Sequence, residues 1–232
     1  MRLLVTVAAV LGVLAPSAAA AARVDQMVVF RSGKARVSHP SMAQTTAKVG
    51  TKRCTVGAAT PLAALIRSDV GPLSLRDFGS CSKRAADAGS LFVSAIGPDR
   101  NKSSDGWVYK AGNVLGTAGS ADPNGPLGRG RLRPGTRVTW FWCHVTGRDG
   151  GCPHTLVIAA TASAGALTVH VREYNDGGKG KPASGATVHA GSQTATTGAD
   201  GSVRITPPAG RYSVFATQAT RIRSFPVTVE VA

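Results

Sequence analysis

The chain has 232 residues, of which 43% are hydrophobic, 17% charged and only 5% aromatic. This composition excludes a disordered polymer, a coiled coil and a membrane protein with several spans, and it suffices for one or two domains with cores of their own. The 28 glycines and 13 prolines favour short strands and turns over long helices.

The charge balance is strongly basic, with 27 Lys and Arg against 12 Asp and Glu and a formal net charge of +15. Between Arg23 and Ser163 there are 19 basic and 8 acidic residues, a net charge of +11, whereas the remainder has 7 and 4, a net charge of +3. Such a positive field attracts anionic partners such as acidic polysaccharides, teichoic-type polymers, nucleic acid or a lipid surface. The alternative is that the charge serves solubility alone.

Residues 1–22 have the pattern of a secretory signal peptide. Arg2 supplies a positive charge, residues 3–15 are almost entirely apolar, and small residues follow Pro16. We expect cleavage after Ala20 or Ala22, which would release a secreted or extracellular chain. An uncleaved anchor is the alternative, because about 20 apolar residues span a bilayer.

Residues 23–161 are expected to form a β-rich domain with one short helix at 60–67. Thr60 can cap this helix, Pro61 suits its first turn, and the apolar residues that follow form one face. Other strands are expected at 24–31, 43–49, 75–78, 91–96 and 107–110, with a long loop at 116–133.

The strongest strand pattern lies at 137–145. Strict alternation divides its side chains between two faces, with Val138, Trp140 and Trp142 on one and Thr139, Phe141 and Cys143 on the other. We expect residues 155–161 to pair back against this strand as a hairpin.

A second domain is expected at residues 167–232, after a small, flexible linker at 162–166. Short apolar stretches separated by turns rich in Gly, Pro and Asp predict a small antiparallel β-sandwich. Its strands are expected at 167–173, 186–190, 193–197, 202–205, 212–217 and 225–231. The expected fold class is therefore mainly β, an α+β, β-rich domain followed by a sandwich.

The chain has four cysteines, Cys54, Cys81, Cys143 and Cys152. An even number in an exported chain predicts two disulfides. Cys143 and Cys152 flank a polar, glycine-rich stretch, so a bridge between them would close a loop, and Cys54–Cys81 follows by elimination. Zinc is the alternative, because a histidine follows each member of the second pair within two residues. The wide spacing is unlike that of structural zinc sites, and we expect no metal.

The first domain resembles the transcobalamin-like C-terminal domain family in three motifs, TPLAALI at 60–66, GWVYKAGN at 106–113 and GTRVTWFW at 135–142. Thr136 stands where the family usually has Asp, and Gly112-Asn113 reverses the usual order. In transcobalamin-type proteins this domain contacts a corrinoid, which makes Trp107 and Tyr109 candidate ligand-binding residues. A large helical barrel completes that site in those proteins, and this chain has none, so we expect no cofactor. The alternative is that both aromatic side chains belong to the core.

The second domain resembles the carboxypeptidase regulatory-like, or transthyretin-like, β-sandwich. The motifs are PASGATV at 182–188, TTGADG at 196–201 and PAGRYSV at 208–214. The resemblance implies a non-catalytic spacer or adhesion module.

Four arginines precede the aromatic residues of the strand at 137–145 and form a candidate site for an anionic polymer. They are Arg129, Arg131, Arg133 and Arg137. A solvated loop that leads into a core strand is the alternative interpretation.

Residues 99–106 place oxygen ligands at every second position, as calcium loops do. However, the glycine, Gly106, stands at position 8 instead of 6, and Lys110 stands at position 12, where calcium loops have Glu, which favours a solvated turn.

These features predict an exported, non-catalytic binding or adhesion-type protein that engages an anionic polymer of the cell envelope. We expect no nucleic-acid partner and no stable membrane insertion after cleavage. We expect no enzyme activity, since the sequence has no G-x-S-x-G elbow and no set of residues with paired catalytic roles. The alternatives are a small-molecule, corrinoid-like binding module and a secreted enzyme with an unrecognised site.

Overall fold

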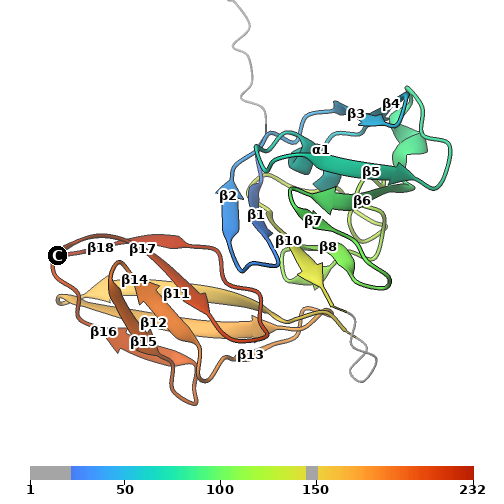
Figure 1. Ribbon diagram of the computed structural model, residues 1–232. Helices are drawn as coiled ribbons and strands as arrows, with labels where there is room; N and C mark the ends of the chain where they lie inside the picture. The colour runs from blue at the N-terminus through green and yellow to red at the C-terminus, as the bar shows by residue number, and fades with distance from the viewer. Residues whose placement is uncertain (1–21, 145–150) are drawn as a thin grey trace, which may run out of the picture.

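The computed structural model describes residues 22–144 and 151–232, so the predicted signal peptide lies outside it apart from Ala22. The described chain is mainly β, as predicted, and forms two domains that lie against each other (Figure 1). In this part of the chain no helix is long and apolar enough to cross a membrane.

A five-stranded sheet forms the centre of the first domain, in the order β2-β1-β10-β8-β9. Its middle strand β10 pairs in parallel with β1 and antiparallel with β8. The bounds are β1 Asp25–Val29, β2 Ala35–Ser38, β8 Gly106–Ala111, β9 Val114–Leu115 and β10 Arg137–Cys143.

Smaller elements cover one face of this sheet. They are the hairpin of β3 (Thr45–Val49) and β4 (Lys52–Val56), the sheet of β5 (Leu73–Asp77), β6 (Leu91–Ile96) and β7 (Asp99–Arg100), the helix α1 (Pro61–Ile66) and the 3-10 turn η1 (Ala85–Ala88). The predicted helix is confirmed, because the buried Thr60 hydroxyl accepts a hydrogen bond from the Ala63 N–H at 3.2 Å and donates one to the Gly57 carbonyl at 2.9 Å.

The second domain is a sandwich of two antiparallel sheets. One has the order β11-β12-β13, with β16 also paired to β12, and the other has the order β15-β14-β17-β18. The bounds are β11 Thr155–Ser163, β12 Ala166–Tyr174, β13 Gly180–Pro182, β14 Thr187–Ala190, β15 Gln193–Thr196, β16 Ser202–Ile205, β17 Gly210–Thr217 and β18 Val227–Val231. Apolar side chains of both sheets form one core between them.

The predicted pairing of residues 155–161 with the strand at 137–145 is wrong. β11 instead pairs with β12 over its whole length, from Thr155 opposite Tyr174 to Ser163 opposite Ala166. The physical reason is that β10 has no free edge, since β1 and β8 occupy both sides of it. Residues 162–166 are therefore the turn of a hairpin and the strand ends beside it, not a linker, and the second domain begins before Thr155.

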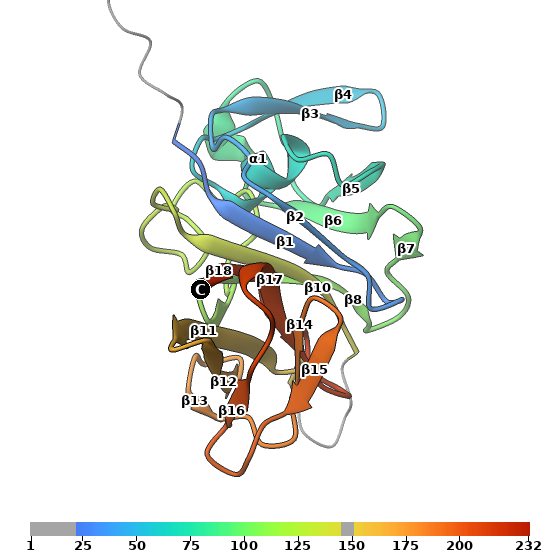
Figure 2. The ribbon, with the colours of Figure 1, turned by 90° about the vertical axis from the view of Figure 1, so that its left-hand side faces the viewer.

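Both faces of the central sheet are buried. Alternation along β8 directs Trp107 and Tyr109 into the core of the first domain, whereas Val108 and Lys110 face the other way. β10 is divided in the same manner, which confirms the two faces predicted for it. The second face packs against the second domain, as Figure 2 shows for the sheet and the sandwich beneath it.

A separate apolar cluster joins the two domains. Met27, Val29 and Phe141 of the central sheet pack against Ile222 and Phe225, which precede β18. The junction thus contains buried apolar side chains from both domains, as a domain core does.

The corrected boundary leads to a test with two fragments. Residues 153–232 should fold alone, whereas residues 164–232 should not, because the shorter fragment lacks Leu156 and Ile158. Losing a buried side chain of this size costs about 2–5 kcal/mol, comparable with the whole stability of a small domain. Circular dichroism during heating should show a cooperative transition for the longer fragment only. Equal transitions for both fragments would contradict the assignment of β11 to the sandwich.

Candidate functional site

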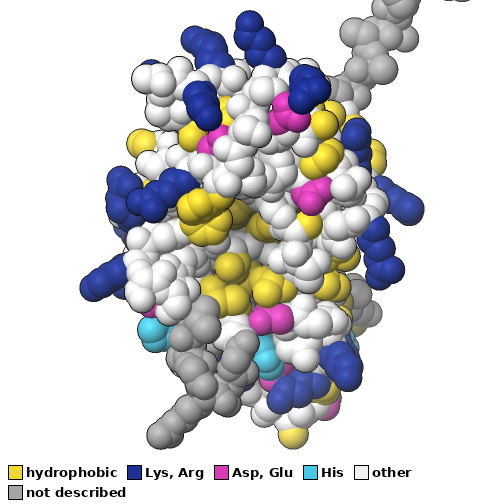
Figure 3. Space-filling model, turned by 90° about the vertical axis from the view of Figure 1, so that its right-hand side faces the viewer, with side chains coloured by type: hydrophobic (Ala, Val, Ile, Leu, Met, Phe, Trp, Pro, Cys, Tyr) yellow, Lys and Arg dark blue, Asp and Glu magenta, His cyan; other side chains and the backbone are white. Residues whose placement is uncertain are grey.

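A cleft at the domain junction is the candidate functional site. It consists of two adjoining hollows with volumes of about 1000 Å³ and about 420 Å³. His144, Arg221 and Ile222 line both. Figure 3 shows hydrophobic side chains gathered in a depression between the upper and lower parts of the molecule, with acidic and histidine side chains just below it.

The smaller hollow has an aromatic wall. Phe30 and Trp142 line it, and the Arg31 guanidinium lies over the Trp142 ring at 4.9 Å from the ring centre. Trp142 is held from behind by the buried Trp107, whose ring is 6.1 Å away in an edge-to-face arrangement. A half-buried aromatic ring beside arginine is suited to a planar or anionic group.

A buried lysine links the two domains behind the cleft. Lys110 of β8 is fully buried, and its Nζ donates hydrogen bonds to the Tyr174 and Asn175 carbonyls at 2.9 Å each and to the Thr155 hydroxyl at 3.3 Å. The Asp176 carboxylate lies 3.7 Å from it. Burial lowers the pKa of Lys110 to about 8, an effect that Asp176 opposes.

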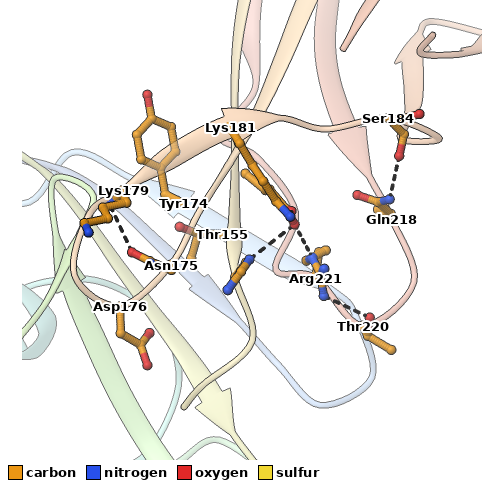
Figure 4. A network of polar contacts seen from close by, with 12 residues as sticks. Thr155, Tyr174, Asn175, Asp176, Lys179, Lys181, Ser184, Gln218, Thr220 and Arg221 are labelled. Carbon is orange, nitrogen blue, oxygen red and sulfur yellow. Dashed lines mark hydrogen bonds and ion pairs between the residues drawn. The ribbon is translucent and has the colours of Figure 1, made fainter. Parts of the chain in front are cut away.

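A second buried charge lies on the sandwich side of the cleft. Glu173 of β12 is buried and pairs with Arg221 and with Lys181, whose Nζ is 3.0 Å away. Figure 4 shows the ends of the Lys181 and Arg221 side chains close together in this polar network. His154 Nδ1 also lies 3.3 Å from it. Burial alone would raise the pKa of Glu173, but the hydrogen bonds from Arg221 and Lys181 lower it to about 2.

The Cys143–Cys152 disulfide fixes the base of the cleft. It joins the end of β10 to the segment that enters the sandwich, and the Cys152 N–H donates a hydrogen bond to Asp176 at 2.9 Å. The same carboxylate therefore contacts the disulfide segment and Lys110, which makes the cleft a rigid feature of the junction.

The chemistry of the cleft favours binding. Its two carboxylates, the buried Glu173 and the half-buried Asp176, are neutralised by lysine or arginine, so neither is poised as a proton acceptor. Among the described residues, no three His, Cys, Asp or Glu side chains come together as a metal site requires.

The structure places the predicted ligand-binding residues Trp107 and Tyr109 in the core of the first domain. They are 4% and 6% exposed. The Trp107 Nε1 donates a hydrogen bond to the Asp99 carbonyl at 2.8 Å, and the Tyr109 hydroxyl donates to the Ala118 carbonyl at the same distance. Of the two interpretations left open by the sequence, the structure shows the core one, because the side that both rings face is covered by the smaller elements of the domain.

The four predicted arginines do not form one group. Arg129, Arg131 and Arg133 are exposed on the loop before β10. Arg137 is half-buried, and its guanidinium lies 5.4 Å from the ring centre of Phe225 at the domain junction. Arg137 therefore contacts the second domain at the junction. The candidate surface for an anionic polymer then consists of Arg129, Arg131 and Arg133.

The predicted disulfides Cys54–Cys81 and Cys143–Cys152 are both confirmed. All four sulfur atoms are used in them, which removes the thiolates that the alternative zinc site required. Two disulfides also fit an oxidising compartment.

The segment at 99–106, which was compared with calcium loops, uses its side-chain oxygens within the protein. Asn101 Oδ1 accepts a hydrogen bond from the Trp107 N–H, and Asp99 Oδ2 accepts one from the Arg31 N–H.

The cleft itself was not predicted from the sequence. Alternation places Trp142 on one face of its strand with Trp140, and Lys110 lies within the motif at 106–113, but neither pattern indicates a cleft. The one available signal was a lysine among the apolar residues of a strand, since a charged side chain at such a position needs partners from another part of the chain.

No family model matches this chain, and the searches of curated proteins and of solved structures found no match either.

The substitution Lys110→Met tests the link between the domains. Methionine keeps much of the volume but leaves the carbonyls of Tyr174 and Asn175 without their donor, which should lower the free energy of unfolding by about 2–4 kcal/mol. The exposed Lys179 provides the control, since Lys179→Met should change it by no more than about 0.5 kcal/mol. Urea denaturation measures both. Equal midpoints for the two variants would show that the buried ammonium contributes nothing to stability.

The pH dependence of stability tests the Glu173 network. The pKa of Glu173 falls from an ordinary value of 4.5 to about 2 on folding, so its stabilising contribution is complete above pH 4.5 and is lost as the pH falls toward 2. Glu173→Gln should therefore be less stable at pH 7 and lose less stability on acidification. Thermal unfolding between pH 7 and pH 2 measures this, with the exposed Glu230→Gln as control. A variant at Glu173 with the acid sensitivity of the unmodified chain would contradict the network.

Proposed function

We propose that this chain is an exported, non-catalytic binding protein that engages an anionic polymer of the cell envelope through its first domain. The observation that carries the proposal is the unequal use of the charges in that domain, where the carboxylates are used in internal contacts and the basic side chains project outward.

Several carboxylates of the first domain accept hydrogen bonds from its own backbone. Asp77 accepts hydrogen bonds from the N–H groups of Gly79 and Cys81, both at 3.1 Å, and Asp122 accepts one from the Asn124 N–H at 2.7 Å. Burial alone would raise the pKa of Asp77, but these backbone bonds lower it. Asp77 and Asp122 therefore act as turn-forming residues, and the acidic side chains of this domain are too few to balance its basic ones.

Few of the basic side chains pair with a carboxylate. Among the described residues of the first domain, only Lys52, Arg84 and Lys110 have a Lys or Arg nitrogen at ion-pair distance from a carboxylate. Lys and Arg side chains surround the upper half of the face drawn in Figure 3. The sequence of this domain has a net charge of +11, and apart from Lys110 and the half-buried Arg137 its described lysines and arginines are exposed to solvent.

The arginine loop is a fixed part of this surface. Leu132 is buried, and its N–H donates a hydrogen bond to the Ala59 carbonyl at 3.0 Å. Its neighbours Arg131 and Arg133 are exposed on either side of this anchor, and the Arg131 Nε donates to the Pro123 carbonyl at 3.0 Å. Anchored arginines lose less conformational freedom when they bind an anionic chain than arginines on a mobile segment would.

The corrinoid-like alternative relied on Trp107 and Tyr109, whose rings are buried. The junction cleft, with Phe30 and Trp142 in its wall, is the place where a small ligand fits best. The resemblance of the second domain to transthyretin-like sandwiches is consistent with a spacer or adhesion role.

The polymer proposal is tested by replacing the three exposed loop arginines. R129Q/R131Q/R133Q should be released from an immobilised teichoic-type polymer or acidic polysaccharide at a clearly lower salt concentration than the unmodified chain. The interaction is electrostatic, and the screening length falls from about 10 Å at 0.1 M salt to about 3 Å at 1 M. K179Q/R204Q/R211Q removes the same charge from the second domain and should elute like the unmodified chain. Equal release of the two triple variants would exclude a role for the loop, and no retention at about 0.15 M salt would leave solubility as the role of the charge.

A further inference from the structure

An exposed aromatic pair lies at the end of the first domain that is farthest from the sandwich. Phe78, just after β5, is 71% exposed and Phe92 of β6 is 41% exposed, with ring centres 5.8 Å apart. Figures 1 and 2 both show the hairpin β3–β4 and strand β5 at this end of the molecule, away from the second domain. Most phenylalanines are buried, so two in contact on the surface form an apolar patch with no partner in the described chain.

The fold holds Phe78 outward. The two oxygens of Asp77 accept the N–H groups of Gly79 and Cys81, which shapes the turn around Phe78. The Phe78 N–H donates to the Ser90 carbonyl at 3.3 Å, and the Cys54–Cys81 disulfide ties the end of the turn to β4. The ring is therefore displayed by a braced turn and does not belong to a loose loop.

Basic side chains lie beside the pair and in the neighbouring hairpin. Arg76 stands directly opposite Phe92 in the sheet, and the Lys52 Nζ lies 3.5 Å from the Asp77 carboxylate. In the neighbouring hairpin Lys48 stands directly opposite Arg53, and both are exposed. Like charges in directly opposed positions destabilise a strand pair. The pairing has no structural benefit, which points to an anionic partner.

A hollow of about 440 Å³ separates the hairpin turn from the Phe78 turn, and Lys52 and Arg76 line its sides. Apolar rings that project beside a cationic hollow match the order of groups at a bilayer surface, where acyl chains lie beneath anionic headgroups.

We propose that this aromatic edge, made up of Phe78 and Phe92 with Lys48, Lys52, Arg53 and Arg76, docks onto an anionic lipid bilayer. Phe78 would enter the boundary between headgroups and acyl chains while the basic side chains contact lipid phosphates. A sugar polymer fits the edge less well, because phenylalanine rings offer no hydrogen bond and the Asp77 oxygens are already used by backbone N–H groups. The proposal does not depend on polymer binding, which was assigned to other residues.

The test is co-sedimentation of residues 22–232 with vesicles of phosphatidylcholine alone or with phosphatidylglycerol added. The unmodified chain should sediment with the anionic vesicles only. Phe78→Ser should weaken that binding about tenfold, since burying one phenylalanine side chain contributes an affinity factor of this order or more. Lys48→Gln with Arg53→Gln should weaken it as well, and at low salt more than at high salt.

Two control variants separate this edge from other surfaces. Val37 is 41% exposed on β2, so Val37→Ser removes a comparable apolar group elsewhere and should leave vesicle binding unchanged. R129Q/R131Q/R133Q should also bind vesicles like the unmodified chain, whatever its effect on polymer retention. Phe78→Trp, with a ring that favours bilayer interfaces, should retain binding and show a blue-shifted fluorescence on anionic vesicles.

Several outcomes would overturn the proposal. They are no sedimentation with anionic vesicles, equal binding to neutral vesicles, equal loss for Phe78→Ser and Val37→Ser, and a Phe78→Trp fluorescence that vesicles leave unchanged. A soluble acidic polysaccharide whose binding falls with Phe78→Ser, without vesicle binding, would assign the edge to a polymer instead. Because Phe78 is mostly exposed, unchanged thermal unfolding of the variants would show that the losses are not due to misfolding.

Discussion

The arrangement of this molecule depends on the central sheet of the first domain, which is covered on both faces, and on the buried ammonium group of Lys110. Lys110 points away from the core of the first domain, and all its hydrogen-bond partners lie in the second domain, at Thr155, Tyr174 and Asn175. A buried ammonium without partners costs several kcal/mol, so the first domain needs the sandwich beside it. The apolar cluster around Phe141 and Phe225 buries hydrophobic surface of both domains. The hydrogen bonds of Lys110 specify which part of the sandwich faces the sheet.

The cleft follows from this junction. The ends of the first-domain strands and the carbonyl-rich turn after β12 are held together by Lys110, by Asp176 and by the Cys143–Cys152 disulfide. Interior charges on the sandwich side are neutralised within the Glu173 network. The wall of the smaller hollow adds Phe30, Trp142 and Arg31, a combination suited to contact with a planar or anionic group.

The charges outside the junction are distributed differently. In the first domain Asp77 and Asp122 stabilise turns, and most lysines and arginines face solvent, so the outer surface of the domain is cationic. The arginine loop and the aromatic edge are separate parts of that surface with different chemistry. The loop offers charge alone and suits a flexible polymer, whereas the edge joins charge to exposed rings and suits an interface between water and lipid.

The elements with local signals could be predicted from the sequence. Thr60 and Pro61 define the start of α1, alternation defines the two faces of β10, and the loop between Cys143 and Cys152 predicted their bridge, which left Cys54 and Cys81 as the second pair. Most strands of the sandwich could be predicted from short apolar stretches between turn residues. Each of these features depends on neighbouring residues in the chain, which is why the pattern was sufficient.

Only the tertiary structure decided which surfaces meet. Alternation showed that Trp107 and Tyr109 share a side, but whether that side is core or ligand face depends on what covers it. Likewise β11 was recognised as a strand, but its partner depended on which strand had a free edge, and β10 had none. The separation of Arg137 from the other arginines and the burial of Lys110 have the same origin, because contacts between residues far apart in the chain leave no periodic signal in the sequence.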